Sequence, residues 1–127
     1  MISNSEIKLI TGLHRKKYRS LHNLFIAEGE KLIKDLLASG AKITHFYTTE
    51  AQENLDLLWS TSPVRITERQ MQKISLQKNP SGWLAVFKQP EITAPDQALW
   101  VVALDDIQDP GNMGTILRLC DWFGITH

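Results

Sequence analysis

Residues 24–40 read LFIAEGEKLIKDLLASG, and they contain the two patterns that decide the fold class. The stretch 24–27 is continuously apolar, which predicts a buried strand ending at Glu28 and Gly29. Residues 30–39 then place four aliphatic side chains on one face of a helix, and Gly40 is typical of the position just after a helix. A strand followed directly by an amphipathic helix predicts an α/β fold.

The same alternation of strands and helices extends over the first 88 residues. Three capping boxes, in which a Ser or Thr is followed three residues later by Glu or Gln, mark helix starts at Ser3, Thr49 and Thr67. Periodicity predicts further helices at 4–12, 50–60 and 68–75, and strands at 42–49, 64–66 and 82–88. We therefore expect a layered α/β domain with a mostly parallel sheet.

The last third of the chain has a different organisation. Residues 91–98 lie in a stretch with two prolines and no periodicity, which predicts a linker between a domain at 1–90 and a segment at 99–127. That segment begins with an apolar run, a predicted strand at 99–107, and continues with a helix from about 112 to 123. One strand and one helix cannot bury their apolar faces alone, so we expect the start of a second, incomplete α/β domain. Alternatively, this strand joins the first sheet.

The composition excludes several classes of protein. The 127 residues carry 14 basic and 14 acidic side chains, so net charge gives no argument for a nucleic-acid partner. A single cysteine excludes an intramolecular disulfide and a cysteine-based zinc site, and the four histidines lack metal-ligand spacing, so no metal is expected. No signal peptide or membrane-spanning segment is recognisable, so we expect a cytoplasmic protein.

The loop DPGNMG, residues 109–114, joins the last predicted strand to the last predicted helix. Glycines and a helix N-terminus can bind a ligand, but the loop matches neither GxGxxG nor a P-loop. The simpler interpretation is a connection in which Asn112 caps the helix. Arg118 adds information, because a guanidinium in so apolar a helix needs a partner. That partner is either a carboxylate, with Asp105, Asp106 and Asp109 as candidates, or a phosphate or ribose.

The stretch LDDIQDPGNMGTILRLCDWFG, residues 104–124, resembles the first conserved motif of the SpoU (TrmH-like) RNA 2′-O-ribose methyltransferases of the SPOUT superfamily. The upstream stretches FIAEGEKLIKDLL and NPSGWLAVF, residues 25–37 and 79–87, are similar to parts of the substrate-binding domain of the same family. The matching positions of the motif are Asp105, Asp109, Pro110, Asn112, Gly114, Arg118, Phe123 and Gly124.

The resemblance implies a fold and an activity. Residues 1–90 would form an RNA-substrate-binding domain, a three-layer α/β/α sandwich resembling ribosomal-protein-type RNA-binding domains, and residues 99–127 would begin a knotted SPOUT domain. The full-length protein would transfer a methyl group from S-adenosylmethionine to a ribose 2′-OH of ribosomal or transfer RNA, as a homodimer. Arg118 and Asn112 would be catalytic. Because the cofactor-binding motifs have no counterpart here, we expect this chain alone to be inactive.

The basic run HRKKYR, residues 14–19, is the leading candidate for RNA contact. Four cations around an aromatic ring suit phosphate contacts and stacking, although such a run can also be a solvated surface turn. Weaker candidates follow later in the chain, where Glu28 could instead complement the N-terminus of the helix at 30–39. The RNA-binding candidates are Arg15, Lys16, Lys17, Tyr18, Arg19, Glu28, Lys78 and Asn79. The alternative function is a stand-alone ribosomal-protein-like RNA-binding module without catalysis.

Overall fold

The computed structural model describes residues 2–49, 61–91 and 100–125. The chain forms two compact units, Met1–Pro90 and Glu91–His127. The helix predicted at 50–60 and the linker predicted at 91–98, apart from Glu91, lie outside the described residues. In the part of the chain that is described, no helix is both long and apolar enough to cross a membrane.

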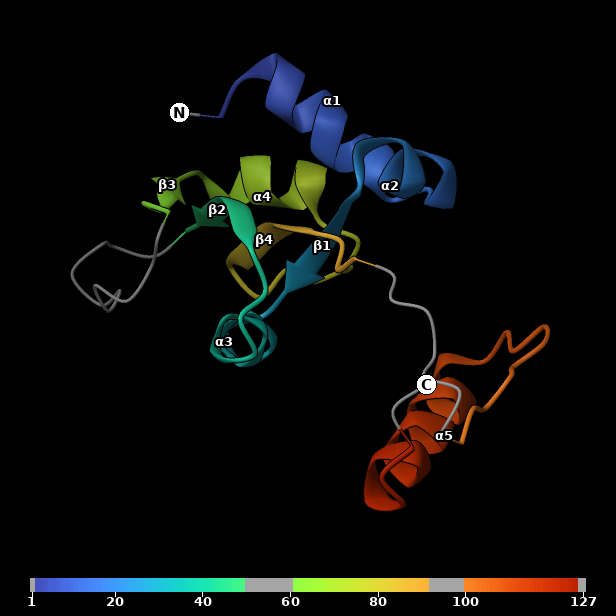
Figure 1. The fold of residues 1–127 in the computed structure, drawn as a ribbon. Helices are drawn as coiled ribbons and strands as arrows, with labels where there is room; N and C mark the ends of the chain where they lie inside the picture. The colour runs from blue at the N-terminus through green and yellow to red at the C-terminus, as the bar shows by residue number, and fades with distance from the viewer. Residues whose placement is uncertain (1, 50–60, 92–99, 126–127) are drawn as a thin grey trace. The chain divides into compact units, whose positions relative to one another are not determined.

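The first unit contains both helices and strands, which confirms the predicted α/β class (Figure 1). Ser3 and Thr67 form the expected capping boxes at the starts of their helices. A short helix over the basic run is an addition, because the sequence analysis left that stretch unassigned. In chain order the elements are α1 Asn4–Leu13, α2 Lys16–His22, β1 Leu24–Glu28, α3 Glu30–Ala38, β2 Ile43–Thr48, β3 Val64–Arg65, α4 Glu68–Ile74 and β4 Trp83–Lys88.

The four described strands form one sheet in the order β1-β4-β2-β3, and the expectation of a mostly parallel sheet is wrong. β4 runs antiparallel to both β1 and β2, whereas the parallel pair β2–β3 covers only two residue pairs. Helices between strands predict crossover connections and parallel strands, but they do not specify the position or the direction of the last strand in the sheet. β4 follows α4 through a loop and enters the centre of the sheet in the reverse direction.

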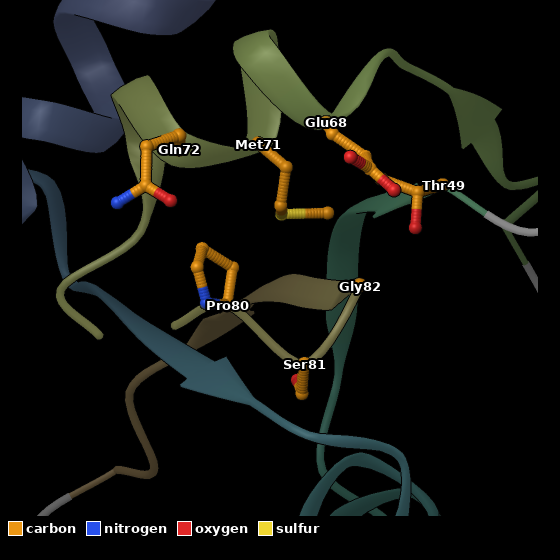
Figure 2. Close-up of a pocket in the computed structure, with 7 residues that line it drawn as sticks. All are labelled: Thr49, Glu68, Met71, Gln72, Pro80, Ser81 and Gly82. Atoms are coloured by element: carbon orange, nitrogen blue, oxygen red, sulfur yellow. The ribbon is translucent and has the colours of Figure 1, made fainter. Parts of the chain in front are cut away.

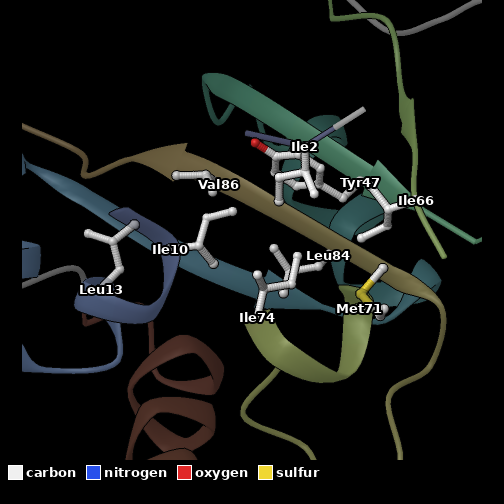
Figure 3. Close-up of a cluster of buried hydrophobic side chains, with 9 residues drawn as sticks. All are labelled: Ile2, Ile10, Leu13, Tyr47, Ile66, Met71, Ile74, Leu84 and Val86. Atoms are coloured by element: carbon white, nitrogen blue, oxygen red, sulfur yellow. The ribbon is translucent and has the colours of Figure 1, made fainter. Parts of the chain in front are cut away.

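Each face of the sheet has its own hydrophobic core. Along β4, Leu84 and Val86 belong to a cluster with residues of α1 and α4, which Figure 3 shows. The alternate residues Trp83, Ala85 and Phe87 belong to a second cluster with Ile33 of α3. Side chains on a strand alternate between faces, so a strand covered on both sides is apolar throughout. This explains the unbroken apolar run in β4.

In the second unit, the described residues contain one helix, α5, which spans Pro110–Trp122. The strand predicted at 99–107 is wrong over residues 100–107, which have no regular structure, and Trp100 is 84% exposed. A strand needs a neighbour for its backbone N–H and C=O groups, and the described residues of this unit contain no other strand. The predicted cap is also wrong. Asp109 caps α5, because its carboxylate accepts the Asn112 backbone N–H at 2.6 Å, and Pro110 occupies the first helical position.

Candidate nucleic-acid interface

The basic run forms the corner between α1 and α2. Arg15 is the N-cap of α2, and Lys16 and Lys17 occupy its first turn. All three side chains are exposed to solvent. Tyr18 follows them and is 38% exposed. The structure thus places three cations and one partly exposed aromatic ring at a single corner, which we call the basic corner: residues 15–18.

Arg19 points back into the protein instead of joining these cations. Its Nη1 donates hydrogen bonds to the carbonyl oxygens of Leu13 and His14, at 3.1 and 3.0 Å. These carbonyls lie at the C-terminal end of α1, where helix carbonyls lack partners and a positive charge is favourable. Arg19 therefore has a structural task, namely to close the turn between α1 and α2.

Three further contacts fix the basic corner in place. The Tyr18 ring packs over Gly12, where an added Cβ would lie 3.6 Å from the ring, and it stacks on His22 with 6.5 Å between ring centroids. His14 Nε2 lies 3.0 Å from the carbonyl oxygen of Ile74, the last residue of α4. The corner is thus joined to both helices that cover this face of the sheet.

Glu28 organises the loop between α4 and β4. Its carboxylate accepts the Leu76 backbone N–H at 2.8 Å and the hydroxyl of Ser75. These partners are about 47 residues away in sequence, and among the described residues no side-chain hydrogen bond caps the N-terminus of α3. A role of Glu28 at that N-terminus stays a prediction. The turn expected at Gly29 is present, with a φ of +101° that favours glycine. Lys78 and Asn79 are exposed in the loop that Glu28 holds.

A cleft of 390 Å³ lies between α4 and the start of β4, at residues for which the sequence predicted no site apart from the loop before it. Figure 2 shows its lining, with Met71 directed from α4 toward the loop 80–82. A signal in the sequence is the run Pro80-Ser81-Gly82, which is typical of a turn. In the structure Gly82 has a φ of +83° and lies where two segments approach closely. The lining residues are Thr49, Glu68, Met71, Gln72, Pro80, Ser81 and Gly82.

In α5, the guanidinium of Arg118 lies back along the helix, toward its N-terminus. Nη2 donates to Thr115 Oγ1 at 3.0 Å, and that hydroxyl donates to the Gly111 carbonyl at 2.9 Å. A Cβ on Gly114 would lie 3.4 Å from Nη1, so the glycine leaves room for the guanidinium. The glycine four residues before the arginine thus brings the charge within about one helical turn of Asn112.

The expected carboxylate partner of Arg118 is not observed. Arg118 is exposed, and in the described structure it forms no ion pair with Asp105, Asp106 or Asp109. A bond to a phosphate or ribose stays a prediction. Among residues 2–49, 61–91 and 100–125, no group of three His, Cys, Asp or Glu side chains could hold a metal ion.

Comparison with known families identifies the chain. A family model described as the MRM3-like substrate binding domain matches residues 4–85. The chain belongs to this family. The earlier resemblance to SpoU (TrmH-like) methyltransferases is confirmed, since the matching relatives and structures are methyltransferases of that kind.

Two curated relatives show how much of a longer protein this MRM3-like chain represents. It is 30% identical to the 23S rRNA (guanosine(2553)-2′-O)-methyltransferase RlmP of Bacillus subtilis, with 96% of this chain and 49% of that protein covered. It is also 30% identical to the mitochondrial rRNA methyltransferase 3 of Xenopus laevis, with 87% of this chain and 29% of that protein covered. The chain therefore spans about half the length of the first and under a third of the second.

Solved structures agree with this assignment. A TrmH-family protein from Porphyromonas gingivalis is 35% identical and superposes with a TM-score of 0.78, over 98% of this chain and 50% of that one. An AdoMet-bound rRNA methyltransferase from Sinorhizobium meliloti is 30% identical with a TM-score of 0.74, over 99% and 51%. Both superpositions thus cover nearly the whole of this chain and about half of each of those proteins.

Proposed function

We propose that residues 2–90 bind the RNA substrate of a ribosomal RNA 2′-O-methyltransferase of the SpoU family. The observation that carries this proposal is the basic corner, in which Arg15, Lys16 and Lys17 are exposed while Arg19 holds the turn beneath them. Membership of a family of substrate-binding domains supports it. We also propose that the helices on either side of the sheet form the three-layer sandwich of ribosomal-protein-type RNA-binding domains.

For the reaction, Arg118 and Asn112 act on the ribose. A 2′-OH is a weak nucleophile, and a fixed cation lowers the barrier by stabilising the negative charge that develops on its oxygen. Arg118 offers that cation from within α5, where Thr115 accepts a hydrogen bond from its guanidinium, and the Asn112 side chain can orient the hydroxyl. S-Adenosylmethionine supplies an electrophilic methyl group when bound, and no described residue of this chain is assigned to hold it.

Three further parts of the proposal rest on the sequence and the family. Because the chain spans about half of RlmP, we propose that alone it neither binds S-adenosylmethionine nor methylates RNA. A calorimetric titration that shows micromolar binding would contradict this. We further propose that the full-length protein is a homodimer and that it works in the cytoplasm.

The RNA-binding part is tested by charge reversal. The variant Arg15→Glu/Lys16→Glu/Lys17→Glu should abolish binding of a fluorescein-labelled single-stranded RNA, measured by anisotropy. If each cation contacts one phosphate, singly neutralised variants should each lower the slope of log affinity against log salt by about 0.7. The control reverses three exposed lysines elsewhere in the first unit, Lys8, Lys42 and Lys88, and should bind better than the first variant. Equal binding by the parent and the basic-corner variant would contradict the proposal.

A further inference from the structure

The cleft between α4 and residues 80–82 has the composition of a nucleotide site. Pro80 provides apolar surface, and Met71, which is only 1% exposed, reaches the lining from the core. Thr49 and Gln72 provide a hydroxyl and an amide group. A second hollow of 570 Å³ shares Thr49 and Glu68 with the first and adds Arg65 to the lining. Small-molecule sites typically measure about 300–1,000 Å³ and combine apolar walls with a few placed polar groups.

The walls of the cleft are held in place by hydrogen bonds. The Thr49 backbone N–H donates to the Gly82 carbonyl at 3.0 Å, which joins the end of β2 to the start of β4. Gln72 Nε2 donates to the Lys78 carbonyl at 3.3 Å, which ties α4 to its own loop. Because Gln72 donates here through its nitrogen, its side-chain oxygen is oriented by the same contact. The cleft is therefore largely formed before any ligand arrives.

α4 connects this cleft to the basic corner. Glu68 and Gln72 are four residues apart, share one helical face, and line the cleft. Arg69 and Lys73 form the adjacent row, and both are exposed. The carbonyl of Ile74, at the other end of α4, contacts His14 beside the basic corner. A helix of seven residues is only about 10 Å long, so this contact places the basic corner near the cleft.

We infer that this cleft takes up one unstacked nucleotide of the bound RNA, with its base and ribose inside. Its phosphates stay outside, on the row formed by Arg69 and Lys73, because the carboxylate of Glu68 in the lining repels a phosphate. Single-stranded RNA is commonly recognised through bases that leave the stack and bond along their edges. Glu68 accepts hydrogen bonds, so it favours bases with an exocyclic amino group over uracil. The inference rests on the proposed RNA-binding function.

The experiment uses the whole chain and fluorescein-labelled single-stranded RNA 10-mers of A, C or U. Gln72→Trp fills the cleft and should weaken binding of the A and C 10-mers about tenfold, and Gln72→Ala, which removes the amide from the lining, should weaken it about fivefold. The U 10-mer should bind more weakly to the parent and respond less. The matched controls Gln77→Trp and Gln77→Ala, in the loop after α4, should bind as the parent does, because Gln77 is exposed and lies outside the lining.

Thermal unfolding of each variant shows whether weaker RNA binding results from a lost contact or from a destabilised fold. If Gln72→Trp and Gln72→Ala keep the melting temperature and the parental affinity for all three RNAs, the nucleotide site is wrong while the RNA-binding function stands. If the parent binds none of the RNAs, the proposed function fails and the nucleotide site fails with it. Weaker binding by both cleft variants, with unchanged melting and unaffected controls, supports the site.

Discussion

Glu6 illustrates how one residue links a local motif to the core. Its carboxylate accepts the Ser3 backbone N–H at 2.8 Å within the capping box, and it also accepts the hydroxyl of Tyr47 at 2.8 Å. Hydrogen bonds from the Ser3 side chain, then from its backbone, then from Tyr47 lower the pKa of Glu6 from 4.5 to about 2. Burial, and then the bond to Glu6, raise the pKa of the Tyr47 hydroxyl above its ordinary range.

This arrangement predicts an acid-sensitive contribution to stability. Since the pKa of Glu6 is lowered in the folded state, its contribution is present above about pH 4.5 and is lost as the pH falls toward 2. Glu6→Gln should therefore lower the melting temperature at pH 7 and reduce its decrease between pH 5 and 2. Circular dichroism during heating measures both. The exposed Glu30→Gln variant is the control, and an unchanged pH profile for Glu6→Gln would refute the assignment.

Gly82 is the second position where a single residue decides local structure. It has a φ of +83°, and an added Cβ would lie 2.7 Å from Thr49 Oγ1. Gly40 has almost the same φ, +84°, but nothing lies within 4 Å of its added Cβ. Gly40→Ala should cost about 1 kcal/mol from backbone strain alone.

Gly82→Ala adds a steric clash to this strain, so it should lower the free energy of unfolding by roughly 1–3 kcal/mol more than Gly40→Ala does. Urea denaturation of the two variants gives the comparison. Equal losses would show that Thr49 moves aside without cost.

Between elements, the turn from α1 to α2 depends on Arg19. Loss of its two hydrogen bonds to α1 carbonyls should destabilise the fold by about 1.5–3 kcal/mol, because a charged donor is involved. Arg19→Met should thus lower the urea midpoint. Lys17→Met, one of the exposed cations of the same helix, should leave that midpoint nearly unchanged but weaken RNA binding. A lower urea midpoint for Lys17→Met and weaker RNA binding for Arg19→Met alone would contradict this assignment of the structural role to Arg19 and the RNA contact to Lys17.

The sequence did not distinguish these two cations. Arg15, Lys16, Lys17 and Arg19 look alike in a basic run, and helical phase decides that only Arg19 reaches back to Leu13 and His14. Contact between Arg19 and RNA therefore stays a prediction, beside a structural task that the structure does show. Glu28 is similar, since its partners Ser75 and Leu76 became visible only in the folded chain.

For the whole molecule, the two core clusters consist entirely of residues from the first unit. We therefore expect a chain that ends at Pro90 to unfold in one cooperative transition, with a midpoint close to that of the first unit in the longer chain. Differential scanning calorimetry of both chains provides the measurement. A broad, non-cooperative transition of the shorter chain would show that residues beyond 90 are needed for folding.

Local rules were enough to determine most elements of this protein from its sequence. Side-chain periodicity, capping boxes at Ser3 and Thr67, and the glycine turn at Gly29 act within a few residues, so they can be recognised without the fold. The motif on α5 and the basic run could be recognised for the same reason. The prediction of a strand at 99–107 is wrong over residues 100–107, because a strand needs a neighbouring strand for its backbone hydrogen bonds and its own sequence does not specify that neighbour.

The tertiary structure alone decided what depends on distant segments. β4 entered the centre of the sheet in the antiparallel direction, although the sequence pattern indicated parallel strands. The cleft was formed by Thr49, α4 and residues 80–82, which are separated by up to about thirty residues along the chain. Strand order and contacts between loops depend on which apolar faces can be buried against each other. Segments from the whole chain contribute these faces, so no single stretch of sequence determines the result.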